Sequence, residues 1–574
     1  MTINIVRRQL QPQFPTTNIL PNRLLQIYAT RGITDEQQIA TGLAGLAHFN
    51  QLKGITLAAQ YLADAIAGQR KIIIVGDFDA DGATSTALCM LALARLDSQN
   101  HDYLVPNRFD FGYGLSPEIV EVAHQQHAQL IMTVDSGIAC IKGVARAREL
   151  GMEVIITDHH LPGEALPDAH AIVNPNQPDC DFPSKNLAGV GVAFYMMLAL
   201  KAELKLRGWF ADKTEPNLAE LLDIVALGTV ADVVKLDHNN RILVHQGIQR
   251  IRSGQCRPGI SAIFEVAGRK QGNLAASDLG FVIGPRLNAA GRLDDMSQGI
   301  ECLLCNDIGQ ARQMAVQLDS LNRERREIEA SMQQEAVKAL DSLQLSEQAL
   351  PYGLCLYQAD WHQGVIGILA GRIKEKYFRP TIAFAHQDDE IIKGSARSIP
   401  GLHIRDLLED INSRYPGLIS KFGGHAMAAG LSLPVSHLAE FETAFHLVAE
   451  QWLQDKPLQG AILSDGELDD HELTLDFARQ LKQAGPWGQG FEEPLFDGVF
   501  NLVEQKIVGQ KHLKMQVTTQ SGELFDAIAF NVDTEQWPNK QARQVQLAYK
   551  LDINEFRGRT SIQLLVDAVD LLDK

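Results

Sequence analysis

The fold is decided by the stretch KIIIVGDFDADGATST, residues 71–86. Its first part, residues 71–75, is a short apolar run dominated by β-branched side chains, which is typical of a buried parallel strand. A glycine ends the run, and three aspartates follow at alternate positions: Asp77, Asp79 and Asp81. Residues 83–96 are rich in alanine and leucine, so a helix is expected after the loop. The pattern predicts a strand, a loop with three carboxylates, and a helix.

Three carboxylates at the end of a buried strand repel one another unless a cation lies between them. Their hard oxygen atoms favour Mg²⁺ or Mn²⁺, and open α/β sheets bind ligands at the carboxyl ends of their strands. The alternative is an aspartate-rich turn with solvated carboxylates, because Asp and Gly are common turn residues. This stretch alone therefore favours a metal site and leaves the turn open.

Candidate ligands also follow three later apolar stretches, each of which we interpret as a strand. Residues 130–134, 154–157 and 221–230 are followed, at once or after one residue, by Asp135, by Asp158, His159 and His160, and by Asp232. A single aspartate after a strand is usually a helix cap or a turn residue. Repetition at four strand ends predicts instead the mixed carboxylate and imidazole set of a two-metal hydrolase.

These motifs resemble a known superfamily. The D-x-D-A-D-G segment, the VDSG segment at Asp135 and the triplet Asp158-His159-His160 are similar to those of the DHH phosphoesterases. Three downstream motifs, GPRLNAAGRL (284–293), GSARS (394–398) and FGGHAMAAG (422–430), narrow the resemblance to the RecJ family of bacterial exonucleases. The resemblance runs from about residue 54 to the C-terminus, with six motifs in the expected order. It implies degradation of single-stranded DNA from the 5′ end to 5′-mononucleotides.

The resemblance also implies roles for the strand-end residues. Two Mn²⁺ or Mg²⁺ ions are expected among Asp77, Asp79, Asp81, Asp135, His159 and Asp232. One ion would take Asp79 and Asp135, the other Asp81, Asp135, His159 and Asp232, so that Asp135 bridges them. His160 would stabilise charge on the phosphoryl oxygens and the leaving group, and Asp158 would orient its neighbours. Water whose pKa the ions lower would attack the scissile phosphorus in line.

Six further residues are candidate DNA or phosphate contacts by the same resemblance: Arg108, Arg286, Asn288, Ser395, Arg397 and His425. Each motif also has a plainer interpretation. A loop arginine such as Arg108 is more often a surface charge, and the small residues around Arg286 also suit tight helix packing. A lone histidine such as His425 is more often structural than a ligand. The resemblance favours the phosphate-binding alternative, in which Ser395 and Arg397 hold the 5′ phosphate together with Arg108.

The order of patterns predicts the architecture. Residues 71–234 alternate strands with helices, which indicates an α/β fold with a doubly wound parallel sheet. Residues 307–343 form one long polar helical pattern of the kind that links domains, and five short strands from residue 499 onward suit a small OB-type barrel. The expected domains are a lead-in (1–50), a DHH catalytic domain (51–305), a linking helix (306–346), a DHH-associated substrate-binding domain (347–450), and a linker with a nucleic-acid-binding barrel (451–574).

Composition limits the function classes. The 574 residues carry a net charge of −18, which argues against a generally cationic coat and requires DNA to bind through a local groove or through metals. Seven scattered cysteines do not form a disulfide framework, so a reducing cytoplasm is expected. Cys302 and Cys305 have C-x-x-C spacing, but their apolar neighbours indicate a packed helix. The sequence shows neither an apolar signal core nor a membrane span.

Two other functions remain open at this stage. One is a DHH enzyme that acts on short oligonucleotides, cyclic dinucleotides or pyrophosphate; the linking helix and the barrel argue against it, because a small substrate needs neither. The other is a non-catalytic scaffold, against which the full set of candidate ligands argues. The resemblance further implies a monomer that works with single-strand-binding protein and a helicase in DNA repair and recombination.

Overall fold

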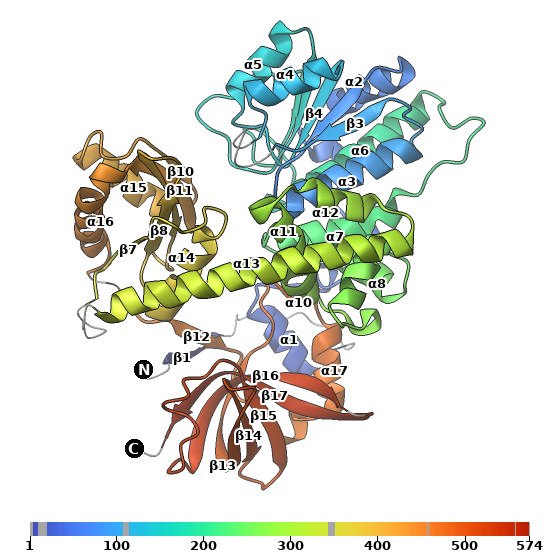
Figure 1. Cartoon of the computed structure of the whole chain (residues 1–574). Coiled ribbons are helices and arrows are strands. Elements are labelled where there is room, and N and C mark those ends of the chain that lie inside the picture. The colour runs from blue at the N-terminus through green and yellow to red at the C-terminus, as the bar shows by residue number, and fades with distance from the viewer. Residues whose placement is uncertain are drawn as a thin grey trace. The chain divides into compact units, whose positions relative to one another are not determined.

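The computed structural model describes residues 4–9, 20–106, 114–342, 350–454, 456, 458–556 and 558–572. The chain folds into two compact units (Figure 1). Unit 1 comprises Met1–Asp319 and Ala461–Lys574, and unit 2 comprises Ser320–Gly460. Unit 1 therefore holds the predicted catalytic domain and the predicted barrel, although these lie at opposite ends of the sequence.

The core of the predicted catalytic domain is a five-stranded parallel sheet. Its strands are β2 (Ile72–Val75), β3 (His101–Leu104), β4 (Leu130–Val134), β5 (Glu153–Thr157) and β6 (Ala171–Val173). Their order is β3-β2-β4-β5-β6, and every pair is parallel. All residues of β2 and β4 are buried, as expected for strands that are covered on both faces. Strand β2 is thus the strand that the apolar pattern of residues 71–75 predicted.

Helices cover both faces of this sheet (Figure 1). On one face, α4 (Pro117–Gln125) and α5 (Ile141–Glu149) form an apolar cluster with side chains of β2, β4 and β5. On the other, α2 (Ile55–Ala67), α3 (Ala80–Arg95) and α6 (Gly189–Leu206) pack together. This arrangement confirms the predicted doubly wound fold.

A helical layer follows the sheet in the chain. It consists of α7 (Leu222–Ala231), α8 (His238–Arg252), α9 (Pro258–Val266), α10 (Ala276–Asp278), a π-helical turn (Leu279–Ile283), α11 (Gly284–Leu293) and α12 (Ser297–Leu304). The predicted strand at residues 221–230 is wrong, because these residues form α7. Every residue from Leu222 to Thr229 is buried, and a helix buried on all sides shows the same continuous apolar run as a buried strand.

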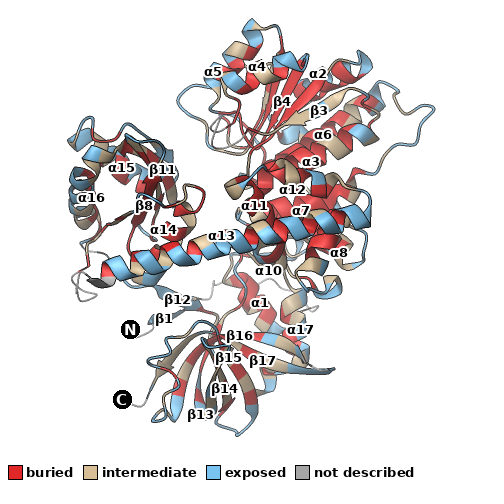
Figure 2. Cartoon of the chain, in the orientation of Figure 1, coloured by how far each residue is buried: buried red, intermediate tan, exposed pale blue. Residues whose placement is uncertain are grey.

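The predicted linking helix is α13 (Ile308–Ser342), along which the chain passes from unit 1 to unit 2. Buried and exposed residues alternate along it (Figure 2). This pattern is typical of a helix that packs on one side and faces solvent on the other.

Unit 2 contains a mixed five-stranded sheet with the order β10-β11-β9-β8-β7. Its strands are β7 (Leu354–Tyr357), β8 (Thr381–His386), β9 (Ile391–Arg397), β10 (Lys421–Gly424) and β11 (Ala428–Pro434). The helices are α14 (Ile366–Tyr377), α15 (Ile404–Arg414) and α16 (Leu438–Leu453). Only β7 and β8 pair in parallel among the described strands of this sheet. The unit is α/β, as predicted.

The C-terminal strands close into a barrel with the order β13-β14-β15-β17-β16. They are β13 (Phe496–Val508), β14 (His512–Thr518), β15 (Leu524–Ala529), β16 (Gln544–Phe556) and β17 (Arg559–Leu571). A short helix, α17 (Leu475–Gln483), packs its apolar face into the same core. The barrel confirms the expected OB-like fold.

The N-terminal residues join the barrel rather than the parallel sheet. β1 (Asn4–Arg7) pairs in parallel with β12 (Ala461–Ser464), and α1 (Asn22–Ala29) contributes Leu24 and Ile27 to the barrel core. Three short 3₁₀ turns follow, at Glu36–Gln38, Leu43–Gly45 and Phe49–Gln51. Side chains of α8 form hydrogen bonds with this segment; for example, Arg241 donates to the carbonyl of Gln38 at 2.6 Å. The lead-in therefore ties the barrel to the helical layer.

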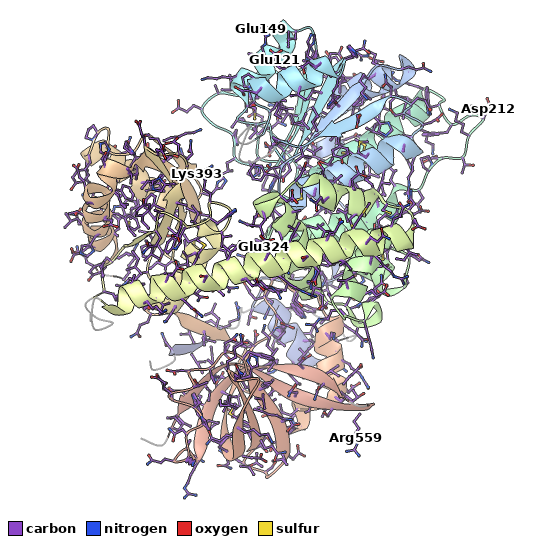
Figure 3. The ribbon with its side chains drawn as sticks, viewed as in Figure 1. Glu121, Glu149, Asp212, Glu324, Lys393 and Arg559 are labelled. Carbon is purple, nitrogen blue, oxygen red and sulfur yellow. The ribbon has the colours of Figure 1, made fainter. Side chains whose placement is uncertain are left out.

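The remaining compositional features have simple structural counterparts. All seven cysteines are free, and Cys302 is buried on α12, as its apolar neighbours indicated. No described helix combines the length and the apolar character needed to cross a membrane. Charged side chains project from the surface of both units, for example Asp212, Glu324 and Arg559 (Figure 3).

Candidate metal centre

All six predicted ligands gather at the carboxyl edge of the parallel sheet. Two sets of side chains each hold ligand atoms within 4.8 Å of one another: Asp77, Asp79 and Asp135, and Asp81, His159 and Asp232. A third, overlapping set adds His160 to Asp135 and His159. Asp232 comes from the C-terminal end of α7, not from a strand. Two adjacent three-ligand sets are the arrangement that two divalent ions require.

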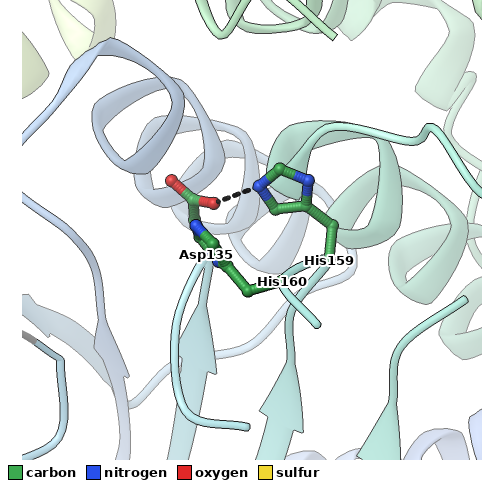
Figure 4. Close-up of side chains that lie close together, drawn as sticks. All are labelled: Asp135, His159 and His160. Atoms are coloured by element: carbon green, nitrogen blue, oxygen red, sulfur yellow. Dashed lines mark ion pairs between the residues drawn. The ribbon is translucent and has the colours of Figure 1, made fainter. Parts of the chain in front are cut away.

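One imidazole nitrogen faces three carboxylates. Nε2 of His159 lies 3.1 Å from Oδ1 of Asp135 (Figure 4), 3.6 Å from Oδ2 of Asp232 and 4.0 Å from Oδ2 of Asp81. His159 follows β5 and Asp135 follows the adjacent β4. The parallel sheet thus places an imidazole and a carboxylate side by side, because neighbouring parallel strands end at the same edge.

The D-x-D-A-D-G loop holds its carboxylates with backbone amides. Asp79 is the N-cap of α3, and its Oδ1 accepts the N–H groups of Asp81 and Gly82 at 2.9 and 3.0 Å. Asp81 accepts the N–H groups of Gly189 and Val190, at the start of α6, with its two oxygens at 2.6 and 2.9 Å. These helix N-termini stabilise the negative charge and determine where each carboxylate lies.

Asp135 has an unusual backbone and a close neighbour. Its φ is 58°, in the left-handed region that non-glycine residues seldom adopt except for Asn and Asp. A Cβ at Gly189 would lie 2.6 Å from Oδ1 of Asp135. Only glycine at position 189 lets α6 begin directly beside this carboxylate.

The crowding of carboxylates changes their acidity. Burial, with the charges of Asp232 and Asp79, raises the pKa of Asp81 well above its ordinary value. Burial and the charge of Asp81 do the same to the pKa of Asp135. Burial and the charge of Asp79 raise the pKa of Asp232 to about 7. The cluster therefore holds negative charge at a cost that a bound cation would offset.

The donor atoms fit a divalent ion. Oδ2 of Asp232 is buried and, within the described part of the chain, accepts no hydrogen bond. A buried carboxylate oxygen without a donor is unfavourable unless a cation completes its surroundings. Carboxylate oxygens with one imidazole nitrogen suit Mn²⁺ and Mg²⁺.

Asp158 and His160 form a second pair beside the ligands. Nδ1 of His160 lies 2.8 Å from Oδ1 of Asp158, which also accepts the N–H groups of His159 and His160. Oδ2 of Asp158 accepts the N–H of Ile138 at 2.9 Å. Burial opposes a charge on His160, but the hydrogen bond and charge of Asp158 outweigh it and raise the pKa of His160 to about 9. Asp158 therefore favours the protonated, positively charged form of His160.

Two asparagines that the sequence did not single out hold the same turn. The Nδ2 group of Asn174 donates to the carbonyl of His160 at 2.9 Å, and that of Asn176 donates to the carbonyl of His159 at 2.6 Å. Both follow β6 in the segment NPN. Their position directly after a strand, at the same sheet edge as the ligands, is the sequence feature that could have identified them.

The candidate DNA contacts of unit 1 have varied surroundings. Arg108 lies outside the described residues. Arg286 is buried and pairs with Asp319, with Nη2 2.8 Å from its Oδ1. Asn288 lies on α11, and its Oδ1 accepts the N–H of Ala80 at 2.9 Å. Asn288 thus contacts the D-x-D-A-D-G loop itself.

In unit 2, Ser395 and Arg397 lie together on β9. Nη1 of Arg397 donates to Oγ of Ser395 at 3.1 Å, and a Cβ at Gly367 of α14 would lie 2.8 Å from both side chains. Arg397 pairs in register with Ala428 of β11, and His425 is in the connection that precedes β11. Burial lowers the pKa of Arg397, and no described carboxylate forms an ion pair with it. The half-buried guanidinium group of Arg397 is therefore well suited to bind an anion.

Family models match three parts of the chain. They are the DHH family N-terminal domain at residues 71–229, the DHHA1 domain at residues 350–454 and the RecJ OB domain at residues 464–568. These matches cover the parallel sheet, the mixed sheet of unit 2 with its helices α14 to α16, and the barrel.

Comparison with known proteins gives the same result over the whole chain. It is 57% identical to the single-stranded-DNA-specific exonuclease RecJ of Dickeya dadantii, across 98% of each chain. Two crystal structures of RecJ from Thermus thermophilus also match. The complex with Mn²⁺ is 28% identical with a TM-score of 0.79, and covers 96% of this chain and 76% of that chain. The complex with Mg²⁺ is 26% identical with a TM-score of 0.73, and covers 96% and 75%. The chain therefore belongs to the RecJ family of single-stranded-DNA-specific exonucleases, within the DHH superfamily.

Proposed function

We propose that this protein hydrolyses single-stranded DNA stepwise from the 5′ end and releases 5′-mononucleotides, with Mn²⁺ or Mg²⁺ as cofactor. The observation that carries the proposal is the pair of adjacent three-ligand sets at the sheet edge. Membership of the RecJ family supports the substrate, since the curated relatives are single-stranded-DNA-specific exonucleases.

Asp79 and Asp135, with Asp77, are proposed to hold one ion, and Asp81, His159 and Asp232, again with Asp135, to hold the second. When bound, such ions lower the pKa of water and neutralise charge on the scissile phosphate. The 3.1 Å separation between Asp135 and His159 supports a shared position for Asp135. The amides of Gly189 and Val190 hold the Asp81 carboxylate with a hydrogen bond to each of its oxygens.

His160 is proposed to act on the phosphate directly. Its positive charge, maintained by Asp158, suits a hydrogen bond to a phosphoryl oxygen or to the leaving oxygen as negative charge develops there. Asp158 itself is buried and already accepts four hydrogen bonds. It therefore acts as an orienting residue for the two histidines.

Recognition of the 5′ phosphate is proposed for Ser395, Arg397 and His425 of unit 2, and Arg108 stays a prediction as a phosphate contact. The half-buried Arg397, which forms no ion pair with a described carboxylate, supports a phosphate at this place. Arg286 and Asn288 stay predictions as DNA contacts. The barrel is proposed to bind the strand by backbone charge and base stacking.

In the cell, we propose a monomer that acts in the cytoplasm during repair, including mismatch repair, and recombination. Single-strand-binding protein and a helicase are the proposed partners. Seven free cysteines support a reducing compartment, and membership of the RecJ family supports the role.

The test is digestion of a long single-stranded DNA labelled at one end or the other, with Mn²⁺, Mg²⁺ or EDTA. Metal-dependent release of labelled mononucleotide from the 5′ end, with duplex DNA left intact, is the expected result. Hydrolysis of dinucleotides with an intact long strand would retain the metal site and overturn the substrate. Absence of Mn²⁺ binding by calorimetry would overturn the metal site as well.

A further inference from the structure

Helix α11 contacts the metal loop at two points. Oδ1 of Asn288 accepts the N–H of Ala80 at 2.9 Å. One turn later, Gly291 lies against the same loop, where an added Cβ would lie 1.8 Å from the carbonyl oxygen of Phe78. Both contacted residues, Phe78 and Ala80, lie directly beside Asp79 in the sequence.

The bond to Ala80 fills a gap in the capping of α3. Ala80 is the first residue of this helix, and Asp79 is its N-cap. An N-cap side chain accepts from the second and third helical N–H groups and leaves the first without an acceptor. Asp79 follows this rule, since its Oδ1 accepts from Asp81 and Gly82. Asn288 supplies the missing acceptor from a residue 208 positions away.

Because Asn288 accepts the N–H of Ala80 and Oδ1 of Asp79 accepts the next two, the other oxygen of Asp79 remains for an ion. Within the described part of the chain, only Oδ1 of Asp79 accepts hydrogen bonds. Because Asn288 takes the Ala80 amide, the Asp79 carboxylate need not rotate to satisfy it. Oδ2 is therefore left without a hydrogen-bond donor among the described residues, in a carboxylate that has a ligand atom within 4.8 Å of those of Asp77 and Asp135.

The other end of α11 is firmly held. Arg286 bonds Oδ1 of Asp319 on α13 through Nε at 3.0 Å and Nη2 at 2.8 Å, and the carbonyl of Val282 through Nη1 at 2.6 Å. The side chains of Arg286 and Asp319 are only 10% and 7% exposed. These bonds of the buried Arg286 fix the position of α11, and with it the position of Asn288 beside the loop.

We propose that Asn288 is a positioning residue for metal binding, which acts through the Ala80 amide on Asp79 and Asp81. This role replaces the DNA contact that the sequence predicts for Asn288. The inference rests on the metal site of the proposed function. It assigns to the GPRLNAAGRL motif the role of support for the metal loop, with Asn288 and Gly291 as its two points of contact.

Three variants separate this role from a DNA contact. Asn288→Ala removes both the acceptor oxygen and the amide donor. Asn288→Asp keeps the acceptor for Ala80 but replaces the donor with a negative oxygen, which would repel a DNA phosphate. Gln298→Ala is the matched control, because it removes an amide of neighbouring α12 that bonds Asp294 and not the loop.

Two measurements on the full chain test this role without hydrolysis of DNA. They are the affinity for Mn²⁺ by calorimetry, and the affinity for single-stranded DNA by fluorescence anisotropy in EDTA. Residues that orient metal ligands typically change metal affinity about 10- to 100-fold. Asn288→Ala should weaken Mn²⁺ binding by about this factor and leave DNA affinity unchanged. Asn288→Asp and Gln298→Ala should bind Mn²⁺ like the unmodified protein.

Unchanged Mn²⁺ affinity in folded Asn288→Ala, or weaker DNA binding in EDTA by Asn288→Asp, would overturn the inference. If Asn288→Ala does not fold, the Asp variant decides alone: retained Mn²⁺ affinity supports the role of the acceptor oxygen, and lost affinity refutes it. Absence of Mn²⁺ binding by the unmodified protein would instead refute the proposed metal site, so the two failures are distinguishable.

Discussion

Nε2 of His159 and Oδ1 of Asp135 lie 3.1 Å apart at the ends of two adjacent parallel strands. This pair joins the two ligand sets, since Asp135 belongs to one and His159 to the other. The sheet therefore places these two ligands side by side, while the loop after β2 supplies Asp77 and Asp79, and helices α3 and α7 supply Asp81 and Asp232. The predictions below test this arrangement one component at a time.

Asp135→Asn should abolish hydrolysis and leave the fold stable. Asn tolerates the left-handed φ of 58° at this position, and the change removes a charge that its neighbours repel. The rate should fall by more than about 100-fold, because even residues that only orient metal ligands change activity by about 10- to 100-fold. Rates on 5′-labelled single strands and melting temperatures in EDTA check both parts.

Asp179→Asn is the control for that variant, since Asp179 has a similar φ of 56° but an exposed side chain. It should retain full activity. An Asp135→Asn protein that hydrolyses DNA normally would remove Asp135 from the metal site.

Metal binding should stabilise the protein more at higher pH. A carboxyl group with a raised pKa in the folded state stabilises the fold below its unfolded-state pKa, and this contribution is lost as the pH rises through the folded-state value. For Asp232 that value is about 7 in the metal-free protein. Mn²⁺ competes with the proton, so the rise in melting temperature on adding Mn²⁺ should be larger at about pH 8 than at about pH 6.

Scanning fluorimetry of the unmodified protein and of Asp232→Asn, with Mn²⁺ or EDTA, measures this difference. The variant has no carboxyl group to titrate at this position and should show a smaller pH effect. An Mn²⁺-induced rise that is equal at both pH values would contradict the shifted pKa of Asp232.

Asp158→Asn should shift the pH dependence of the reaction. Asp158 keeps His160 protonated up to a pKa of about 9, so loss of its charge lowers the pKa of His160 toward the ordinary value. The alkaline limb of kcat/KM should then move to lower pH. Rates with Mg²⁺ across the neutral and alkaline range provide the measurement, and an unmoved limb would exclude His160 as the charged group.

Arg397→Ala should reduce the preference for a 5′ phosphate more than it reduces hydrolysis. A hydrogen bond to a charged group contributes about 1.5–3 kcal/mol, which corresponds to about a 10- to 150-fold change in the ratio of kcat/KM for phosphorylated and hydroxyl-ended strands. Arg405→Ala, an exposed arginine of the same unit, is the control. An unchanged ratio in Arg397→Ala would count against the assignment.

Local patterns in the sequence predicted most of the architecture. Apolar runs followed by Asp or His identified β2, β4 and β5 and the ligands after them, because strand burial and strand-end chemistry are both local properties. The same holds for α13 and for the barrel, whose periodicities are long and clear. The prediction of a strand at residues 221–230 was wrong. A fully buried helix and a buried strand are equally apolar, so the apolar pattern does not distinguish them.

The candidate ligands can thus be recognised within short stretches of sequence, whereas the groups that hold them in place are known only from tertiary contacts. Asp81 is held by amides of α6, the two histidines by Asn174 and Asn176, and the loop by Asn288. Asn174 and Asn176 could be suspected from their position after a strand, but the spacing of the motifs does not predict the contacts of α6 or of Asn288. A hydrogen bond across 208 residues depends on how helices pack on the sheet, and packing is a property of the whole chain, whereas a strand followed by an aspartate is visible within a few residues.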